Sequence, residues 1–321
     1  MKILVTGGHG FIGSNFISYW NRKYPHDEIV NLDKLSYAAN TKHLSYLDGV
    51  ANYTFVKGDI ASYELMESLT KDMDFVINFA AESHVDNSIT DSTQFINSNI
   101  VGVHSILEAV RKNEVRFHQV STDEVFGSLP YLSKDKFHDD SPYDPKNPYS
   151  ATKASADFIV RAYFNTYKLP LTISNCGNNF GPRQHPEKLI PKTILNALSG
   201  EKIPVYGNGS QIRDWIFVED HCIALDLILK KGEYGKTYLI GANNEHRNID
   251  VVTQILNLLG KNLDLIEFIA DRPGHDVRYA LDSSTMQETL GWKVKYEFTD
   301  AIRKTIEHYA TNTDLYEIPP F

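Results

Sequence analysis

A glycine-rich stretch, VTGGHGFIGSN, occupies residues 5–15, between a short apolar run and a longer amphipathic one. Gly7, Gly10 and Gly13 are spaced three apart. With Gly8 in place of Gly7, the glycines also fit the pattern G-x-G-x-x-G. Such spacing permits a tight turn from strand to helix, and a pyrophosphate can then approach the free N–H groups at the start of the helix. The stretch therefore predicts a strand–turn–helix unit that binds a dinucleotide; the alternative is a glycine turn with a purely structural role.

Strand-like and helix-like patterns alternate along the first half of the chain. Strands that alternate with helices form a parallel sheet, which is covered on both faces and wound by right-handed crossovers. We therefore expect an α/β fold built on a Rossmann-type, doubly wound parallel sheet. The predicted strands are residues 3–5, 28–32, 53–56, 75–79, 115–120 and 171–174, and the longest predicted helices are residues 91–112 and 148–167.

The pattern loosens after about residue 176, where glycine, proline and asparagine become frequent and the elements become shorter. One more strand-like run, residues 237–241, can still belong to the first sheet. We expect a dinucleotide-binding domain over residues 1–175, rejoined by about residues 218–242. The rest of residues 176–321 is expected to form a smaller, interleaved α/β domain that binds the substrate.

Charge, cysteine content and hydropathy narrow the class of protein. The net charge of −9 argues against nucleic acid or an anionic membrane as the main partner. Cys176 and Cys222 are too few for a disulfide framework, and no apolar stretch reaches membrane-spanning length. The N-terminus is predicted to be a strand and turn rather than a signal peptide. Glu82, His84 and Asp86 fit no common metal site in their spacing, so no metal is expected. We predict a soluble, cytoplasmic protein.

An aspartate marks the end of the second predicted strand. Asp33 lies twenty residues after Gly13. An acidic side chain at this place accepts hydrogen bonds from ribose hydroxyls and repels a 2′-phosphate. The cofactor is therefore predicted to be NAD rather than NADP. By the same reasoning, Asp59 and Ile60, which follow the third strand, are expected to flank the adenine.

Tyr149 and Lys153 lie four residues apart on predicted helix 148–167, so they share one face of it. A tyrosine hydroxyl has a pKa of about 10 in solution, which is too high for a base at neutral pH. A nearby ammonium and a positively charged nicotinamide ring are expected to lower that pKa. Tyr149 would then remove a proton from a sugar hydroxyl while hydride leaves the same carbon, and Lys153 would reach the nicotinamide ribose.

Together, the glycine-rich opening, Asp33 and the Tyr149–Lys153 pair resemble the extended short-chain dehydrogenase/reductase superfamily, which includes nucleotide-sugar epimerases, dehydratases and decarboxylases. Within it, the chain from residue 1 to about residue 309 is similar to the dTDP-glucose 4,6-dehydratase family. The resemblance implies an NAD-dependent lyase that converts dTDP-glucose to dTDP-4-keto-6-deoxyglucose and water, on the way to deoxysugars such as rhamnose. The stretches that carry it are FAAESHVDNSI, STDEVFG, GNNFGPRQHPEKLIP, YGNGSQIRDWIFVEDH and DRPGHDVRYALD.

Two carboxylic acids, Asp123 and Glu124, stand side by side in STDEVFG, where a buried strand is predicted to open into a loop. Close carboxyl groups share a site only when their pKa values separate, which suits one acid and one base. By resemblance, Glu124 removes the C5 proton after oxidation at C4, and Asp123 protonates the departing C6 hydroxyl. Thr122 would hydrogen-bond the C4 oxygen beside Tyr149. Adjacent strand residues face opposite ways, so the backbone must bend near Asp123 for both acids to reach one sugar.

The resemblance also implies binding residues, position by position, among them basic residues that would hold a diphosphate in an otherwise acidic protein. Gly177 and Phe180 stand where the family more often has serine and tyrosine, and Ser98 stands where it often has threonine. The implied cofactor-binding residues are Gly7, Gly10, Phe11, Ile12, Gly13, Asp33, Lys34, Leu35, Ser36, Asp59, Ile60, Phe79, Ala80, Ala81, Glu82, Ser98, Tyr149, Lys153 and Asn179. The implied substrate-binding residues are Ser83, Thr122, Asn178, Lys188, Leu189, Pro204, Tyr206, Arg213, Asn244, Arg272 and His275.

Two other functions stay open at this point. A 4-epimerase or decarboxylase of the same superfamily would need only Tyr149, Lys153 and NAD, and would leave the two carboxylic acids idle. For a 4,6-dehydratase or a 4-epimerase, a UDP or CDP sugar stays open as the substrate. A non-catalytic nucleotide sensor on the same fold would need none of the proton-transfer groups.

A homodimer is also expected, because helices 91–112 and 148–167 carry apolar residues on more than one face. A helix that packs on a sheet buries a single stripe, so the surplus predicts a partner surface, and the resemblance implies that these two helices pair between subunits. The apolar residues in question are Ile100, Val103, Ile106, Leu107, Phe158, Ile159, Tyr163 and Phe164.

Overall fold

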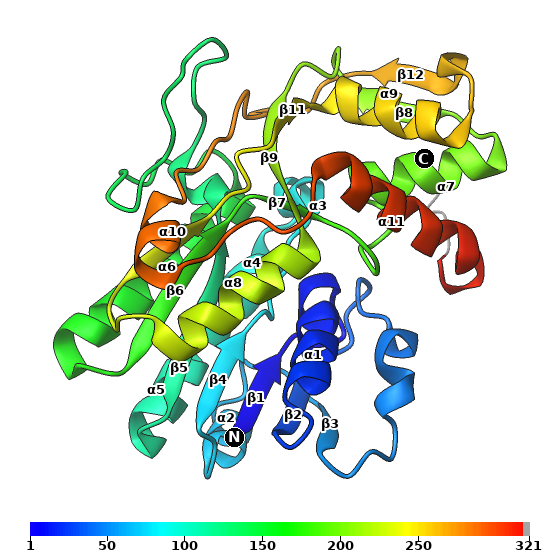
Figure 1. Cartoon of the computed structure of the whole chain (residues 1–321). Coiled ribbons are helices and arrows are strands. Elements are labelled where there is room, and N and C mark those ends of the chain that lie inside the picture. The colour runs from blue at the N-terminus through cyan, green and yellow to red at the C-terminus, as the bar shows by residue number, and fades with distance from the viewer. Residues whose placement is uncertain (317–321) are drawn as a thin grey trace.

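The computed structural model describes residues 1–316, and its largest element is a sheet of seven strands (Figure 1). The strands lie in the order β10-β6-β5-β4-β1-β2-β3, and all neighbouring pairs are parallel. The predicted α/β fold and its strands are thereby confirmed, and the run near residue 240 joins the sheet at its edge. The bounds are β1 (Lys2–Thr6), β2 (Glu28–Asp33), β3 (Tyr53–Lys57), β4 (Phe75–Asn78), β5 (Arg116–Thr122), β6 (Leu171–Cys176) and β10 (Thr237–Ile240).

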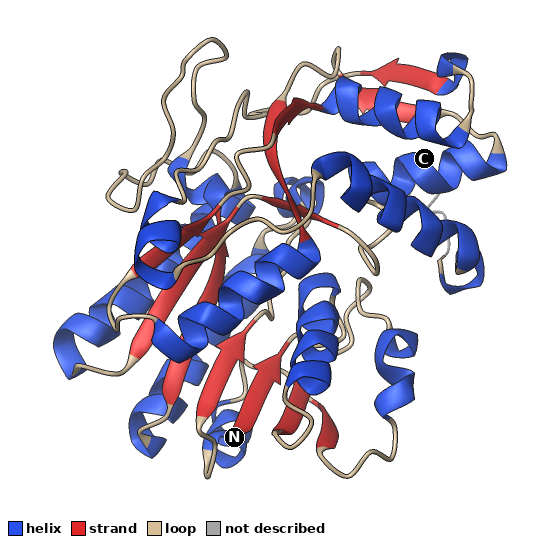
Figure 2. Ribbon diagram, viewed as in Figure 1, coloured by secondary structure: helices blue, strands red, loops and turns tan. Residues whose placement is uncertain are grey.

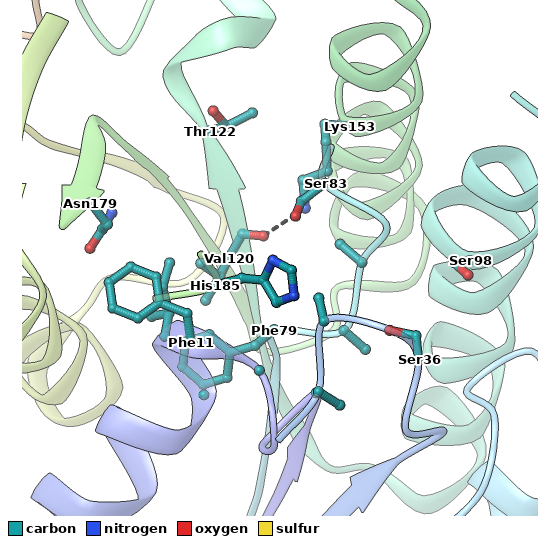
Figure 3. Close-up of a pocket in the computed structure, with 18 of the residues that line it drawn as sticks. Phe11, Ser36, Phe79, Ser83, Ser98, Val120, Thr122, Lys153, Asn179 and His185 are labelled. Carbon is teal, nitrogen blue, oxygen red and sulfur yellow. Dashed lines mark hydrogen bonds between the residues drawn. The ribbon is translucent and has the colours of Figure 1, made fainter. Parts of the chain in front are cut away.

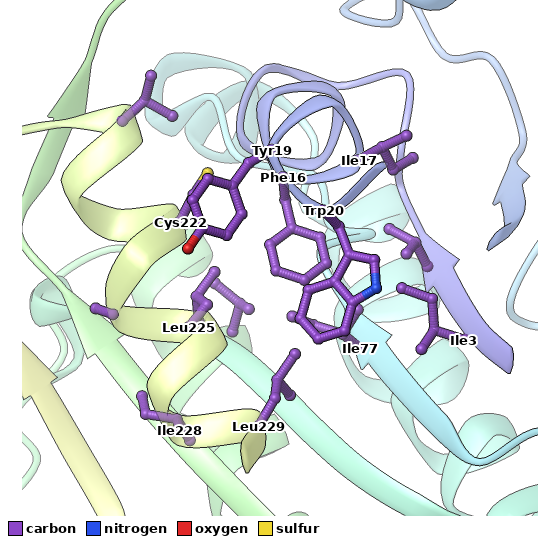
Figure 4. Packing of buried hydrophobic residues seen from close by; sticks show 14 of the residues in the cluster. Ile3, Phe16, Ile17, Tyr19, Trp20, Ile77, Cys222, Leu225, Ile228 and Leu229 are labelled. Atoms are coloured by element: carbon purple, nitrogen blue, oxygen red, sulfur yellow. The ribbon is translucent and has the colours of Figure 1, made fainter. Parts of the chain in front are cut away.

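Helices cover both faces of this sheet (Figure 2). On one face, Phe16 and Trp20 of α1 pack with Leu225 and Leu229 of α8 in a continuous apolar cluster (Figure 4). Burial of each large side chain contributes about 1.5–3 kcal/mol relative to exposure, so this face ties α8, late in the sequence, to the N-terminal strands. The first face carries α1 (Phe11–Lys23), α8 (Val218–Lys231) and α10 (Ser284–Leu290), and the other carries α2 (Tyr63–Thr70), α5 (Gly102–Asn113) and α6 (Pro148–Tyr167).

Helix α6 has the predicted bounds because its ends are specified locally. Asn147 caps it: the side chain accepts a hydrogen bond from the Ser150 N–H, and the Ser150 side chain accepts one from the Asn147 N–H. Pro148 occupies the first helical position, where its missing N–H costs nothing. At the other end, Lys168 adopts a left-handed conformation that stops the helix.

The helix expected over residues 91–112 is not one regular α-helix. It begins at Thr93 as α4 (Thr93–Ile96), continues through a π-helical turn, η2 (Asn97–Val101), and becomes α5. In that turn Asn99 hydrogen-bonds both backbone groups of Glu82, accepting at 2.9 Å and donating at 3.0 Å, and also donates to Thr152 of α6. A π turn in mid-helix often marks a functional region, and here it joins the helix to the loop after β4.

A smaller unit lies beyond the carboxyl ends of the central strands (Figure 1). It contains two small sheets, β11-β9-β7 and β12-β8, around an apolar cluster that includes Phe180, Trp215 and Ile302. The chain enters this unit after β6 and returns to the main sheet for α8 and β10, so the two are interleaved. Its elements are β7 (Asn178–Phe180), α7 (Leu189–Ser199), β8 (Ile203–Tyr206), β9 (Ile212–Phe217), β11 (Glu245–Arg247), α9 (Asn248–Leu259), β12 (Ile266–Ile269) and α11 (Phe298–Thr311).

The remaining helices of the described chain are short. They are α3 (Val85–Thr90), η1 (Thr41–Leu47), η3 (Asp123–Phe126), η4 (Leu263–Leu265) and η5 (Thr313–Leu315). Within residues 1–316, none of the helices is long and apolar enough to cross a membrane.

Candidate active site

The carboxyl ends of β1, β2, β4, β5 and β6 surround a first cavity of about 310 Å³ (Figure 3). Ligands of open α/β sheets bind at this edge, and the volume lies within the range of small-molecule sites. The predicted cofactor-binding residues that line it are Gly7, Gly10, Phe11, Ile12, Gly13, Asp33, Lys34, Ser36, Asp59, Ile60, Phe79, Ala80, Ala81, Ser98, Tyr149, Lys153 and Asn179.

The glycine turn leaves no room for side chains. Gly7 has φ +71°, and a Cβ there would lie 2.6 Å from the Ala80 nitrogen. A Cβ on Gly13 would lie 2.3 Å from the Gly7 carbonyl oxygen. Gly8 is not part of the lining; it packs against the Asn31 side chain instead. The set spaced three apart is therefore the one that faces the cavity, and it forms a backbone cradle that fits a pyrophosphate.

Asp33 is held at the cavity wall with only 8% of its surface exposed. Its carboxylate accepts the His9 N–H at 2.9 Å and the Leu35 N–H at 2.8 Å. Leu35 does not line the cavity, contrary to prediction. Its positive φ of 59° turns the backbone so that its N–H meets Asp33, and its place is behind that carboxylate.

Glu82 is likewise absent from the lining. Its carboxylate pairs with the Lys34 ammonium at 2.8 Å, and the same ammonium donates to the Ser98 hydroxyl at 2.8 Å. Glu82 therefore positions Lys34, which does line the cavity. The serine that replaces threonine at position 98 keeps its hydroxyl in use.

Sequence reasoning missed part of the lining. The missed residues at strand ends could have been predicted from the rule that ligands of open α/β sheets bind at the carboxyl ends of the parallel strands. No local sequence pattern marked the residues of the loop between β7 and α7, because they are distant in sequence from the glycine turn and from most of the strand ends that they meet in the fold. The missed residues are Leu32, Ala38, Ala39, Gly58, Val120, Ser121, Cys176, Gly177, Gln184, His185 and Glu187.

The backbone bends where the two carboxylic acids meet, as predicted. Strand β5 ends at Thr122, and the 3₁₀-helix η3 starts at Asp123. The Thr122 hydroxyl accepts the Glu124 N–H at 3.3 Å and so fixes the bend. Thr122, Asp123 and Glu124 all line the first cavity.

The two carboxyl groups differ in environment. Burial raises the pKa of Asp123 well above its usual value, and the charge of Glu124 raises it further. Burial also raises the pKa of Glu124, but Arg213 and Lys188 oppose that effect. Asp123 therefore holds its proton more firmly than Glu124 does. The pair offers one acid and one base to the same space.

Tyr149 and Lys153 both line the first cavity, one turn apart on α6. Burial raises the pKa of Tyr149 well above 10, and Glu124 adds to that effect, while a hydrogen bond with Thr122 lowers it. In the protein alone Lys153 is not among the main influences on this pKa, so the lowering expected from the ammonium together with a bound nicotinamide stays a prediction. The Lys153 ammonium donates to the Val120 carbonyl at 2.8 Å (Figure 3).

A second cavity, of about 550 Å³, opens between the main sheet and the smaller unit. It is continuous with the first, because both are lined by Ser83, Glu124, Asn178, Asn179, Gln184, Glu187 and Lys188. Thr122 lines only the first cavity. The predicted substrate-binding residues that line the second are Ser83, Asn178, Lys188, Leu189, Pro204, Tyr206, Arg213, Arg272 and His275.

Asn244 does not line either cavity. Its backbone N–H binds the Asp214 carboxylate at 2.9 Å, and its side-chain oxygen contacts the His246 ring at 2.9 Å. Asn248, four residues on at the start of α9, lines the second cavity instead. Its side-chain oxygen is buried and has no hydrogen-bond partner in the protein. The asparagine that lines the second cavity is therefore one that the sequence did not indicate.

Basic groups gather in the second cavity despite the acidic composition. Arg213 stacks over the Tyr279 ring at 4.3 Å and donates to the Asp276 carbonyl at 2.9 Å. Arg272 donates to Asp86 at 3.0 Å, and its buried Nε has no partner. Planar guanidinium groups held in this way suit a phosphate or diphosphate. Within the described residues, no cluster of histidine, cysteine and acidic side chains is placed to hold a metal ion.

Comparison with known proteins gives consistent matches over nearly the whole chain. A family model described as GDP-mannose 4,6 dehydratase matches residues 4–305. A low-salt glycan biosynthesis protein of Haloferax volcanii is 48% identical over 311 residues, which cover 96% of this chain and 98% of that protein. The dTDP-glucose 4,6-dehydratase of Mycolicibacterium smegmatis is 46% identical over 313 residues, covering 97% and 94%. The crystal structure of dTDP-glucose 4,6-dehydratase from Bacillus anthracis in complex with NAD superposes with a TM-score of 0.92 at 44% identity, over 98% of each chain.

Proposed function

The chain belongs to the family described as GDP-mannose 4,6 dehydratase, and within it we propose that this protein is an NAD-dependent dTDP-glucose 4,6-dehydratase. Close relatives and solved neighbours are named for this reaction, and one neighbour holds NAD. The observation that carries the proposal is the pair Asp123 and Glu124, which differ in environment: both line the first cavity, and Glu124 also lines the second. An epimerase has no use for such a pair.

The first cavity fits NAD, because Gly7 and Gly13 leave the backbone bare where a Cβ would collide, and Asp33 offers a carboxylate to ribose hydroxyls. When bound, NAD accepts hydride from the sugar and later returns it, so no outside oxidant is needed. The diphosphate of the substrate would lie against Arg213 and Arg272 in the second cavity. This leaves the glucose ring at the junction, beside the catalytic groups.

The proton transfers then follow from the protonation states. Tyr149 takes the proton of the C4 hydroxyl as a phenolate, with Thr122 hydrogen-bonded to the same oxygen; the charges of Lys153 and bound NAD would lower its pKa, which burial raises in the protein alone. The resulting 4-ketone makes the C5 hydrogen acidic, and Glu124 removes it. Asp123 donates its proton to the departing C6 hydroxyl, which leaves as water. Glu124 returns its proton to C5 when hydride reaches C6. The proton that Tyr149 took from the C4 hydroxyl then passes to Asp123 and regenerates its protonated form. The overall change is the loss of one water.

We also propose that the chain forms a homodimer, although fewer of the apolar residues are available for the interface than the sequence suggested. Val103, Ile106 and Leu107 are fully buried in the core of the chain, so they cannot belong to a partner surface. Phe158 and Val101 stay exposed, at 55% and 43%, on α6 and the π turn. Exposed apolar groups on neighbouring helices support a dimer through this face. Sedimentation at micromolar concentration would test it, and a monomer would contradict it.

The domain and pathway assignments are proposals as well. Residues 1–175 with 218–242 would form the NAD-binding domain, and the rest the nucleotide-sugar domain. The interleaving of α8 and β10 supports that division. The product would serve deoxysugar synthesis, such as that of rhamnose, in the cytoplasm.

The test is incubation with dTDP-glucose, UDP-glucose, CDP-glucose and GDP-mannose, followed by mass detection of a product lighter by one water. We expect conversion of dTDP-glucose above the others. Conversion of another sugar nucleotide in its place, or epimerisation without water loss, would refute the proposed substrate or reaction.

Two variants then separate the roles of the carboxyl groups. In Glu124→Gln, NADH absorbance should rise and persist, with little exchange of the C5 hydrogen for deuterium. In Asp123→Asn, exchange should continue while water loss slows. A general acid or base typically contributes about 10²–10⁴-fold, so both defects should be plain. A substrate with fluoride at C6, a better leaving group, should reduce the rate defect of Asp123→Asn but not that of Glu124→Gln. Equal loss of C5 exchange in both variants would contradict the assignment.

A further inference from the structure

One buried carboxyl group outside both cavities is not used by the mechanism above. Asp157 lies on α6, one turn after Lys153, with none of its surface exposed. It is absent from the lining of either cavity, so it touches neither cofactor nor substrate. Burial of a carboxyl group is costly unless something compensates for it.

Three donors converge on one oxygen of this carboxyl. The Ser121 hydroxyl donates to Oδ2 at 2.8 Å, the Tyr143 hydroxyl at 3.0 Å and the Asn175 amide at 3.1 Å. Several donors on one carboxylate oxygen favour the ionised form. The other oxygen, Oδ1, is buried and accepts no hydrogen bond. Burial raises the pKa of Asp157, while the charge of Lys153 and these three donors lower it and so favour the ionised form.

The same network forms hydrogen bonds with three successive residues at the end of β5. Lys153 donates to the Val120 carbonyl at 2.8 Å, Ser121 donates to Asp157, and Asn175 donates to the Thr122 carbonyl at 2.9 Å. Asp157 and Lys153 are therefore anchored on adjacent residues of the strand that presents Thr122. The charge and the ammonium share one face of the helix.

We propose that Asp157 is a positioning residue that keeps the Lys153 ammonium charged and seated on β5. Lys153 is fully buried, and burial lowers its pKa, while the negative charge of Asp157 raises it. A neutral Lys153 would lose its attraction for the ribose and for a developing phenolate on Tyr149. This inference rests on the proposed function, in which Lys153 supports oxidation at C4.

Other groups near the ammonium do not replace Asp157. On α6 itself the titratable neighbour is Tyr149, and at the end of β6 it is Cys176, whose pKa burial raises to about 12. After β5, Asp123 and Glu124 line the same cavity, but the charge that raises the pKa of Lys153 most is that of Asp157, followed by that of Cys176. On the far side of Asp157, Arg161 donates to the Tyr143 hydroxyl at 2.8 Å.

The test compares Asp157→Asn with Ser121→Ala and Tyr143→Phe, using single-turnover formation of NADH between pH 6 and 10. Loss of the charge lets the pKa of Lys153 fall, so the charged form disappears at lower pH. We expect the basic limb of the rate profile to move to lower pH in Asp157→Asn, and beyond it the rate should fall about tenfold for each further pH unit. Each control variant removes one of the three donors but keeps the carboxyl group, so its basic limb should move less than that of Asp157→Asn.

Asp157→Glu and Asp157→Gln form a second pair, matched in shape and different only in charge. If Asp157→Asn does not fold, these two should still differ in their basic limb. A third measurement needs no substrate: the ¹³Cε shift of Lys153, assigned with Lys153→Arg, should titrate at lower pH in the neutral variants. An unchanged titration, or equal profiles in Glu and Gln variants, would overturn the inference even if dTDP-glucose is the substrate. Failure of the wild type to convert dTDP-glucose would instead refute the proposed function.

Discussion

Replacement of Gly13 by alanine should damage both folding and cofactor binding. The new Cβ would lie 2.3 Å from the Gly7 carbonyl oxygen and 2.9 Å from the Gly8 Cα, both of them backbone atoms. Ordinary contacts of a Cβ start near 3.4 Å, so the start of α1 and the turn have to separate by about 1 Å. That turn is the cradle for the pyrophosphate, so its N–H groups would lose their alignment.

The cost follows from the packing. Forcing an extra methyl into a closely packed place typically costs about 1–3 kcal/mol. For domains of about 150–250 residues, each kcal/mol lowers Tm by roughly 2–4 °C, so a fall of about 2–12 °C is expected. Gly10→Ala is the matched control. Its Cβ meets only the Gly7 oxygen, at 3.3 Å, and its φ of −74° suits alanine.

The assay is thermal unfolding followed by circular dichroism, with NAD binding by calorimetry after removal of bound nucleotide. Gly13→Ala should melt earlier and bind NAD more weakly. Gly10→Ala should melt within about 2 °C of the wild type, because its methyl has a single close neighbour, the Gly7 oxygen, at 3.3 Å rather than 2.3 Å. Equal melting of the two variants would refute the argument from close contact.

Two further predictions concern Asp123 and the mouth of the first cavity. Burial raises the pKa of Asp123 in the folded state. Above the unfolded pKa, this group therefore lowers the free energy of unfolding, by about 1.4 kcal/mol for each pH unit up to the folded pKa. Asp123→Asn should accordingly be more stable than the wild type at pH 7.5. Urea unfolding should show this gain vanish below about pH 3, where both states are protonated, and a gain that persists there would contradict the cause. The Tyr37 hydroxyl donates to the Glu187 carboxylate at 3.2 Å and so joins the loop after β2 to the loop before α7, beside the first cavity. Without this hydrogen bond, Tyr37→Phe should release NAD about 2–10-fold faster in a stopped-flow chase. An unchanged release rate would rule out a role of Tyr37 in retaining NAD.

Local patterns were sufficient for the sheet and for much of the first cavity. Short apolar runs alternating with amphipathic ones led to all seven parallel strands, and the cap at Asn147 with Pro148 specified the start of α6. The glycine turn and Asp33 could be located because a tight turn and a strand end are properties of neighbouring residues. The bend at Asp123 also followed from the period of a strand.

Only the tertiary structure decided what depends on distant groups. The identity of the asparagine that lines the second cavity, Asn248 rather than Asn244, depends on how α9 packs against that cavity. The burial of Val103 and Ile106, expected on a partner surface, depends on the neighbours of α5. The pKa of Tyr149 is high because the fold removes water from it and brings Glu124 near, which no spacing in the sequence can reveal. Charge and burial act through space, so residues far apart along the chain determined these features.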